Sequence, residues 1–117
     1  MDFINTKLDD NRKPARIEDT VTVGRVEDIP PGRCVTVDLS DGGELALYNV
    51  NGEFHATSNF CPHRGAPLAM GRLTGHLIEC DRHGWQFDVR TGECLTVNEP
   101  IEVYEVFVED GLIKIRI

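Results

Sequence analysis

Two short motifs each combine one cysteine with one histidine. Residues 61–63 read Cys-Pro-His and residues 80–83 read Cys-Asp-Arg-His, which makes the candidate ligands Cys61, His63, Cys80 and His83. Thiolates and neutral imidazoles are ligands of zinc, copper and iron–sulfur centres. Neither motif can hold a metal centre alone. Two loops that fold against each other would present all four ligands around one centre.

A glycine follows each histidine closely. Gly65 comes after Arg64 in the first motif, and Gly84 comes directly after the second histidine. Glycine allows a positive φ and lets backbone N–H groups approach a bound group, while Pro62 restricts φ within the first motif. Ordinary turn formation explains these residues equally well, so both interpretations stay open.

Short β-strands joined by turns must position these motifs. Asn51-Gly52 and Asp110-Gly111 separate neighbouring β-favouring runs and suit the positive φ of type I′ hairpin turns. The predicted strands are Thr20–Val26, Cys34–Leu39, Leu45–Val50, Glu53–Thr57, Ile101–Glu109 and Leu112–Ile117.

The fold class is predicted to be all-β, because no window shows a helical period. We expect a small antiparallel β-sandwich or partly open barrel. In the last run Ile113, Ile115 and Ile117 alternate with basic residues, which predicts one buried face. The stretch from Ser58 to Gly75 shows little alternation and predicts a long functional loop.

The length of 117 residues suits a single domain. The first twenty residues are rich in charge and lack apolar periodicity, so we expect a flexible extension over residues 1–20 and one domain over residues 21–117. No apolar run approaches the roughly 18–20 residues of a membrane helix, so no membrane contact is expected.

The charge is strongly acidic, with 20 acidic and 12 basic residues and a formal net charge of −8. This balance disfavours nucleic acid and anionic membranes as partners and suits a basic protein surface. A solvated exterior that keeps the chain soluble explains it equally well. Residues 60–87 differ from the rest, since three arginines there outnumber two acidic residues.

The four cysteines are predicted to stay reduced. The N-terminus has neither the basic start nor the apolar region of a secretory signal, which predicts a cytoplasmic location and favours metal ligation over disulfides. Cys34 and Cys94 have no neighbouring ligand at metal spacing and are expected to be small buried residues. His55 and His76 are also unpaired in the sequence, so we leave them out of the site.

The pattern C-x-H followed by C-x-x-H resembles the cluster-binding signature of Rieske 2Fe-2S proteins. Glu53–Thr57 resembles the strand that leads into the first cluster loop of that family, and residues 84–93 resemble the hairpin after the second. The resemblance extends from Val21 to Ile117.

The resemblance implies one Rieske-type 2Fe-2S cluster as cofactor. Cys61 and Cys80 would bind the inner iron, and His63 and His83 the outer, more exposed iron. Neutral imidazoles leave such a cluster less negative and raise its reduction potential relative to an all-cysteine cluster. The resemblance implies no catalytic residue.

The chain differs from the high-potential branch of the family at the positions of a disulfide and of a serine. Those proteins join the two loops by a disulfide, whereas this chain has Ala66 and Arg82 at the matching positions. Trp85, which we expect to pack in the core, stands where they carry a serine that bonds the cluster. We therefore expect a potential near the lower end of the Rieske range, about −150 mV rather than +300 mV.

The expected function is one-electron transfer from a flavin-dependent reductase to a terminal oxygenase, as in the ferredoxins of ring-hydroxylating dioxygenase systems. An oxygenase would need a second iron held by two histidines and a carboxylate, and only His55 and His76 remain. The chain also lacks a glycine-rich dinucleotide fingerprint. We therefore expect an electron-transfer component rather than an enzyme.

Two alternatives stay open. The chain could be a fixed Rieske-like small subunit of an oxidoreductase such as assimilatory nitrite reductase. It could also be a zinc-stabilised binding module, although the paired cysteine spacing usual in such zinc sites is absent.

Overall fold

The computed structural model describes residues 20–40, 42–62, 65–82 and 84–117. Their strands are β1 (Thr20–Arg25), β2 (Cys34–Asp38), β3 (Glu44–Val50), β4 (Glu53–Ser58), β5 (Arg72–Thr74), β6 (Leu77–Glu79), β7 (Gln86–Asp88), β8 (Val103–Glu109) and β9 (Leu112–Arg116). Two short 3₁₀ turns, η1 (Val26–Asp28) and η2 (Leu68–Met70), complete the regular structure of these residues.

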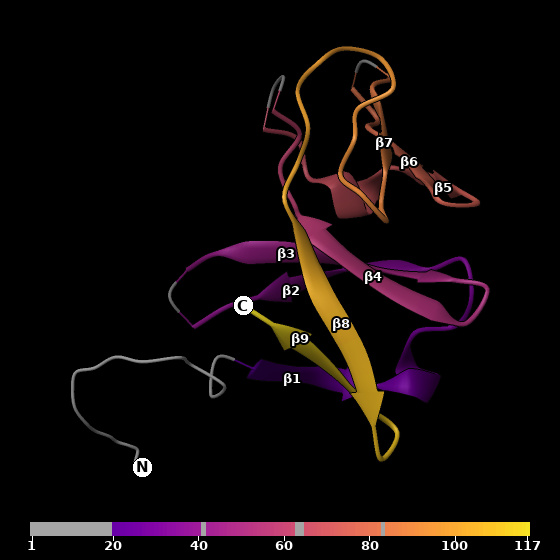
Figure 1. Ribbon diagram of the computed structural model, residues 1–117, viewed down its shortest axis with the longest axis vertical. Helices are drawn as coiled ribbons and strands as arrows, with labels where there is room; N and C mark the ends of the chain where they lie inside the picture. Colours follow the sequence, from indigo (N-terminus) through magenta and orange to yellow (C-terminus); the bar gives the residue numbers. More distant parts are fainter. Residues whose placement is uncertain (1–19, 41, 63–64, 83) are drawn as a thin grey trace.

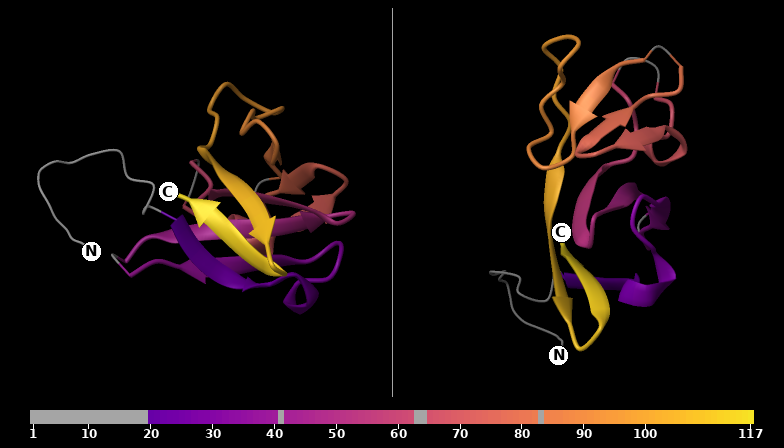
Figure 2. Two further views of the ribbon diagram at one scale, coloured as in Figure 1. Left: turned by 60° about the horizontal axis from the view of Figure 1, so that its bottom comes forward. Right: turned by 90° about the vertical axis from the view of Figure 1, so that its right-hand side faces the viewer.

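The strands form two antiparallel sheets (Figure 1). The larger sheet has the order β1-β9-β8-β4-β3-β2, and the smaller has the order β5-β6-β7. The larger sheet curls on itself, and the smaller sheet lies beyond one end of it (Figure 2). The predicted all-β class is confirmed, in the form of a partial barrel with a small added sheet. Among the described residues no helix is long and apolar enough to cross a membrane.

Both predicted hairpin turns are confirmed. Asn51 and Gly52 have φ values of 53° and 94° between β3 and β4, and Asp110 and Gly111 have 55° and 76° between β8 and β9. Positive φ at both central residues is the requirement of a type I′ turn. Each turn therefore sets the register of its hairpin, with Val50 opposite Glu53 in the first.

Strand β3 is buried on both faces, because the two halves of the molecule pack against its opposite sides. Leu45 and Leu47 belong to an apolar cluster inside the curl of the larger sheet. Tyr48, on the opposite face, belongs to a second cluster that includes Ile78 and Phe87 of the smaller sheet. The smaller sheet is therefore attached to the larger one through this shared strand.

The predicted alternation along the last strand is confirmed for Ile113 and Ile115, which are fully buried. Ile117 is 46% exposed instead, because β9 ends one residue before it, at Arg116.

The expectation of a loop without regular structure from Ser58 to Gly75 is wrong in its second half. That segment contains η2 and β5, and β5 pairs with β6 directly after it. Three-residue strands are too short to show alternation in the sequence. Their pairing depends on Gly71, since a Cβ at that position would collide with the carbonyl oxygen of Glu79.

The expected division into an extension over residues 1–20 and a domain over residues 21–117 stays a prediction. Residues 1–19 lie outside the described part of the chain. Thr20 already belongs to β1, where it lies opposite Arg116.

Candidate metal centre

The two predicted motifs begin where strands of different sheets end. β4 of the larger sheet ends at Ser58, three residues before Cys61, and β6 of the smaller sheet ends at Glu79, directly before Cys80. The end of β4 points toward the smaller sheet (Figure 1). Both cysteines therefore belong to the half of the molecule that contains the smaller sheet.

The two loops share one pattern of backbone hydrogen bonds. The N–H of Cys61 donates to the carbonyl of Ala66 at 2.9 Å, and the N–H of Gly65 donates to the carbonyl of Cys61 at 2.7 Å. In the second loop Cys80 donates to Trp85 at 2.8 Å, and Gly84 donates to Cys80 at 3.1 Å. The offsets are the same in both loops, so the two cysteines occupy equivalent positions.

The glycines close these turns in a conformation that side chains disfavour. Gly65 has a φ of 71° and Gly84 a φ of 73°. This left-handed region is accessible to glycine without steric cost. The backbone therefore accounts for a glycine four residues after each cysteine, although the histidine stands at a different offset in each motif.

Both cysteines are buried in the same apolar cluster. Cys61 is 2% exposed and Cys80 is 1% exposed. Leu68, Ile78 and Phe87 belong to the same cluster. None of the four cysteines of the chain forms a disulfide. The structure thus brings two of the four predicted ligands together, while His63, His83 and Arg64 lie outside the described residues.

The described residues fit a metal–sulfur group. Two buried cysteines enter one apolar site from two equivalent loops, and thiolates are the preferred ligands of iron–sulfur clusters and of zinc. Apolar walls restrict access of water to such a site. Two unrelated structural cysteines would not be expected at equivalent positions of two loops that share the same two backbone hydrogen bonds.

Asn59 supports the first loop, a role the sequence analysis did not identify. Its side chain is fully buried; Nδ2 donates to Glu44 Oε1 at 3.0 Å, and Oδ1 accepts the N–H of Ala69 at 3.0 Å. Its carbonyl oxygen accepts the N–H of Leu68 at 2.6 Å. Asn59 therefore holds η2 against the larger sheet. A single asparagine before a cysteine carries no signal of this role in the sequence.

The hairpin expected after the second loop is confirmed. Phe87 of β7 forms an isolated bridge with Cys94, and the N–H of Asp88 donates to the carbonyl of Glu93 at 2.9 Å. Trp85 is half-buried and packs against the apolar cluster of the cysteines, which agrees with its predicted core position.

Cys34 and Cys94 meet the expectation of buried strand residues only in part, because Cys34 is half-buried and Cys94 lies outside the named strands. Cys34 lies half-buried on β2, where burial raises the pKa of its thiol to about 11. Cys94 is 9% exposed and accepts a hydrogen bond from the N–H of Val97. A thiol with a raised pKa is a poor nucleophile at neutral pH, which agrees with a structural position for Cys34.

His55 and His76, which have no neighbouring ligand in the sequence, both contact one carboxylate in the structure. The Nε2 atoms of His55 and His76 lie 3.4 Å and 3.6 Å from Oε1 of Glu53. His76 precedes β6, whereas Glu53 and His55 belong to β4. The packing of the two sheets brings these three residues together, which spacing along the chain does not reveal.

Comparisons with known proteins agree with the geometry of the loops. Residues 19–106 match the family model of the Rieske 2Fe-2S domain. The chain is 40% identical over 93 residues to a Ralstonia protein, the ferredoxin component of naphthalene 1,2-dioxygenase/salicylate 5-hydroxylase systems. This similarity covers 78% of the chain and 88% of the relative.

Solved structures show the same fold. The chain is 34% identical to a chain in the complex of reduced oxygenase and oxidized ferredoxin of carbazole 1,9a-dioxygenase, with a TM-score of 0.80, covering 84% of this chain and 93% of that one. It is 28% identical to a Mycobacterium tuberculosis protein assigned as the small subunit of an NADH-dependent nitrite reductase, with a TM-score of 0.77, covering 82% and 92%.

Replacing Gly65 by valine should lower the iron content of the purified protein and its thermal midpoint, because a β-branched residue at positive φ costs about 1–3 kcal/mol. A Cβ at Gly65 meets no described atom within 4 Å, so the expected cost comes from the backbone conformation. Gly65→Asn should keep more iron, since asparagine tolerates this region.

Gly75→Val is the matched control, because Gly75 has a φ of 60° and equally open surroundings but lies in the turn between β5 and β6. It should lose stability and keep its iron. Full iron content in Gly65→Val would contradict the role assigned to the first turn.

Proposed function

Because the chain belongs to the Rieske 2Fe-2S domain family, we propose that Cys61, His63, Cys80 and His83 hold its single 2Fe-2S cluster. The observation that carries this assignment is the pair of buried cysteines at equivalent positions of two matched loops. The same two motifs carry His63 and His83 in the sequence, and we assign these as the remaining ligands.

The chain is an electron carrier of a multicomponent dioxygenase system and not itself an enzyme. When bound, the cluster supplies one-electron redox chemistry. The electron comes from a reductase, which we take to be flavin-dependent, and passes to a terminal oxygenase.

The cysteines and the histidines of the two loops are assigned to different irons of the cluster. Cys61 and Cys80 lie in the apolar interior and are assigned to the inner iron. His63 and His83 are assigned to the outer iron. Turns closed by backbone hydrogen bonds hold both cysteines in position.

The potential is expected near the low end of the Rieske range, about −150 mV. Ala66 is 6% exposed and Arg82 is exposed, so the two positions that a disulfide would join carry different side chains in different surroundings. Trp85 packs against the apolar cluster and offers no hydroxyl to a cluster sulfide.

The surface next to the loops suits a transient protein partner. Phe60 directly precedes Cys61 and is 46% exposed, and Met70 is 69% exposed. Met70 lines an open groove beside the second loop together with Cys80 and Asp81. Exposed apolar side chains at the point of electron exit favour docking there. Arg82, in an otherwise acidic chain, would orient the partner.

The carrier is proposed to be mobile and cytoplasmic, with residues 1–20 as an extension and residues 21–117 as the cluster domain. The reduced state of all four cysteines is consistent with a reducing compartment. A fixed small subunit, as in nitrite reductase, is the second candidate, because a relative assigned to that role has the same fold. Gel filtration of native complexes separates the two: persistent co-elution with a large enzyme subunit would exclude a mobile carrier.

His63→Ala and His83→Ala should each lose the cluster, because the outer iron then lacks a ligand. The dithionite-reduced parent protein should give a rhombic electron paramagnetic resonance signal with an average g below the free-electron value, and both variants should lose it together with their visible absorption. Asn98→Ala, which changes an exposed side chain outside both loops, is the control and should keep both. A colourless parent protein with full zinc occupancy would refute the electron-transfer function.

Reversing Arg64 and Arg82 to Glu should slow electron transfer to the oxygenase at low ionic strength, because the local positive charge that orients the partner is lost. The difference from the parent protein should shrink as salt is added. Arg33→Glu with Arg116→Glu makes the same charge change on the larger-sheet half and serves as control. Equal rates for parent and Arg64/Arg82 variant at every salt concentration would show that these arginines play no part in docking.

A further inference from the structure

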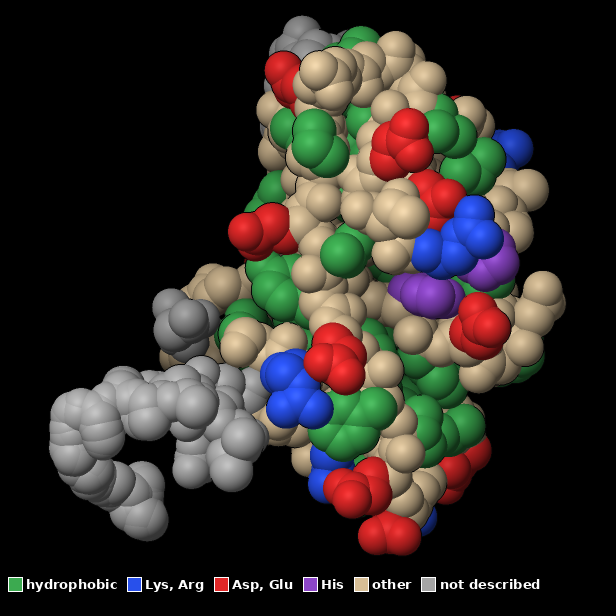
Figure 3. All heavy atoms as spheres, in the orientation of Figure 1, with side chains coloured by type: hydrophobic (Ala, Val, Ile, Leu, Met, Phe, Trp, Pro, Cys, Tyr) green, Lys and Arg blue, Asp and Glu red, His purple; other side chains and the backbone are tan. Residues whose placement is uncertain are grey.

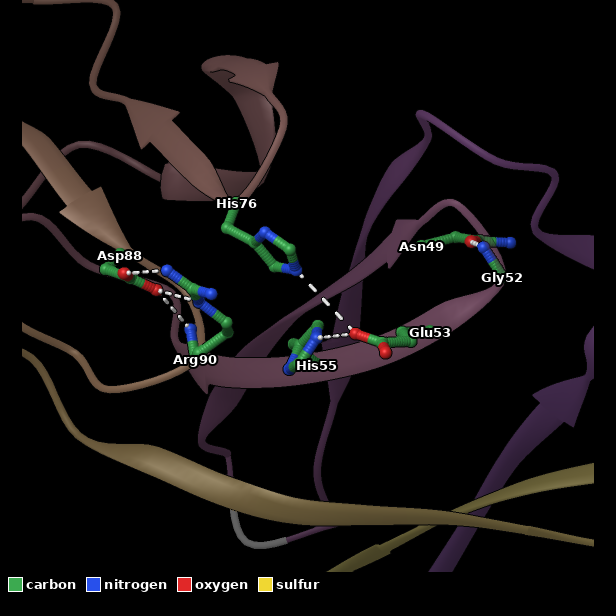
Figure 4. A network of polar contacts seen from close by, with 7 residues as sticks. All are labelled: Asn49, Gly52, Glu53, His55, His76, Asp88 and Arg90. Carbon is green, nitrogen blue, oxygen red and sulfur yellow. Dashed lines mark hydrogen bonds and ion pairs between the residues drawn. The ribbon is translucent and has the colours of Figure 1, made fainter.

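A second group of potential metal ligands lies outside the two cysteine loops. Glu53 and His55 are two residues apart on β4 and therefore point to the same side of the strand. His76 reaches toward them from the turn between β5 and β6 (Figure 4). The ligand atoms of all three side chains lie within 4.8 Å of one another.

The distances between these atoms suit a tetrahedral ion. Zinc binds nitrogen and oxygen at about 2.0–2.1 Å, so two of its tetrahedral ligands are about 3.3 Å apart, whereas ligands at a right angle would be about 2.9 Å apart. Oε1 of Glu53 lies 3.4 Å from Nε2 of His55 and 3.6 Å from Nε2 of His76. Both edges are close to the tetrahedral value. The two imidazole rings stand at 77° with centroids 5.7 Å apart, so small side-chain rotations bring the third edge into range.

The backbone already holds these residues in place. His55 lies opposite Tyr48 in the β3–β4 hairpin, and the carbonyl of His76 accepts the N–H of Val89 at 2.9 Å. The group is also reachable from solvent, because the side chains of His55 and His76 are 21% and 32% exposed and that of Glu53 is 70% exposed. A water molecule can therefore complete the coordination.

The local charge favours a cation. Arg90 is the neighbouring basic side chain in Figure 4, and Asp88 binds it through two contacts, of 2.8 Å and 3.1 Å. Asp88 therefore balances much of the Arg90 charge, and Glu53 adds a further carboxylate beside the two histidines. On the face shown in Figure 3, histidine side chains lie beside acidic and basic ones between the two halves of the molecule.

We propose that Glu53, His55 and His76 form a binding site for one zinc(II) ion, separate from the 2Fe-2S cluster. Two imidazoles and one carboxylate favour zinc over magnesium or calcium, which prefer oxygen ligands. The ion would link β4, which leads to Cys61, to the segment that leads through β6 to Cys80. It would thereby hold together the two strands from which the cluster loops extend.

Isothermal titration of the iron-loaded full chain, produced without a histidine tag, with zinc chloride tests this site. One ion per chain should bind, the thermal midpoint should rise, and the visible spectrum of the cluster should stay unchanged. His76→Gln and Glu53→Gln should each weaken binding by more than the about tenfold that loss of an outer hydrogen-bond partner typically causes. Glu99→Gln, which removes an exposed carboxylate elsewhere, should bind zinc as the parent does.

Three results would overturn the proposal. They are the absence of saturable binding, unchanged affinity in both ligand variants, or zinc uptake that bleaches the cluster and so reveals capture by its own ligands. The Glu53 side chain is exposed, so Glu53→Gln should fold normally. It therefore tests the site even if His76→Gln fails to fold. The proposal does not depend on the electron-carrier function, because an unchanged resonance signal together with absent zinc binding would refute only the zinc site.

Discussion

The hydrogen bond from a glycine N–H to a cysteine carbonyl, made once in each loop, is the constraint on which the site depends. It joins Gly65 to Cys61 at 2.7 Å and Gly84 to Cys80 at 3.1 Å. The turn closes in this way because the glycine adopts a positive φ. The two motifs place their histidines at different distances from the cysteine, yet their loops have the same backbone hydrogen bonds. Both cysteines therefore belong to the same apolar cluster at equivalent loop positions.

The loops are stable because the larger sheet supports them. β3 is buried on both faces, with Leu47 in the core of the partial barrel and Tyr48 in the cluster that contains the cysteines. Asn59 adds polar contacts from the chain before Cys61 to Glu44 and to η2. A buried amide with its donor and its acceptor both satisfied specifies one arrangement, since any other would leave it unpaired. The metal centre is therefore part of the main fold and not a separate module.

The same two segments that carry the cysteines also approach each other at Glu53, His55 and His76, on the side chains proposed to bind zinc. Electron transfer and this second site would then depend on one geometric relation, the position of β4 relative to the β5–β6 hairpin. The surface proposed for partner docking is a different one, around Phe60 and Met70, where large apolar side chains are exposed. A small exposed patch fits a partner that binds and leaves, because transient complexes bury little area.

The sequence by itself determined the features that depend on neighbouring residues. Asn51-Gly52 and Asp110-Gly111 specify their hairpins because positive φ is a local requirement, and the long strands show their alternation directly. The paired motifs identified the Rieske family and predicted Cys61 and Cys80 as cluster ligands. Only the tertiary structure decided the three-residue strands β5 and β6, the support from Asn59 and the meeting of His76 with Glu53. These features depend on contacts between segments distant in the chain, for which no local period or propensity exists.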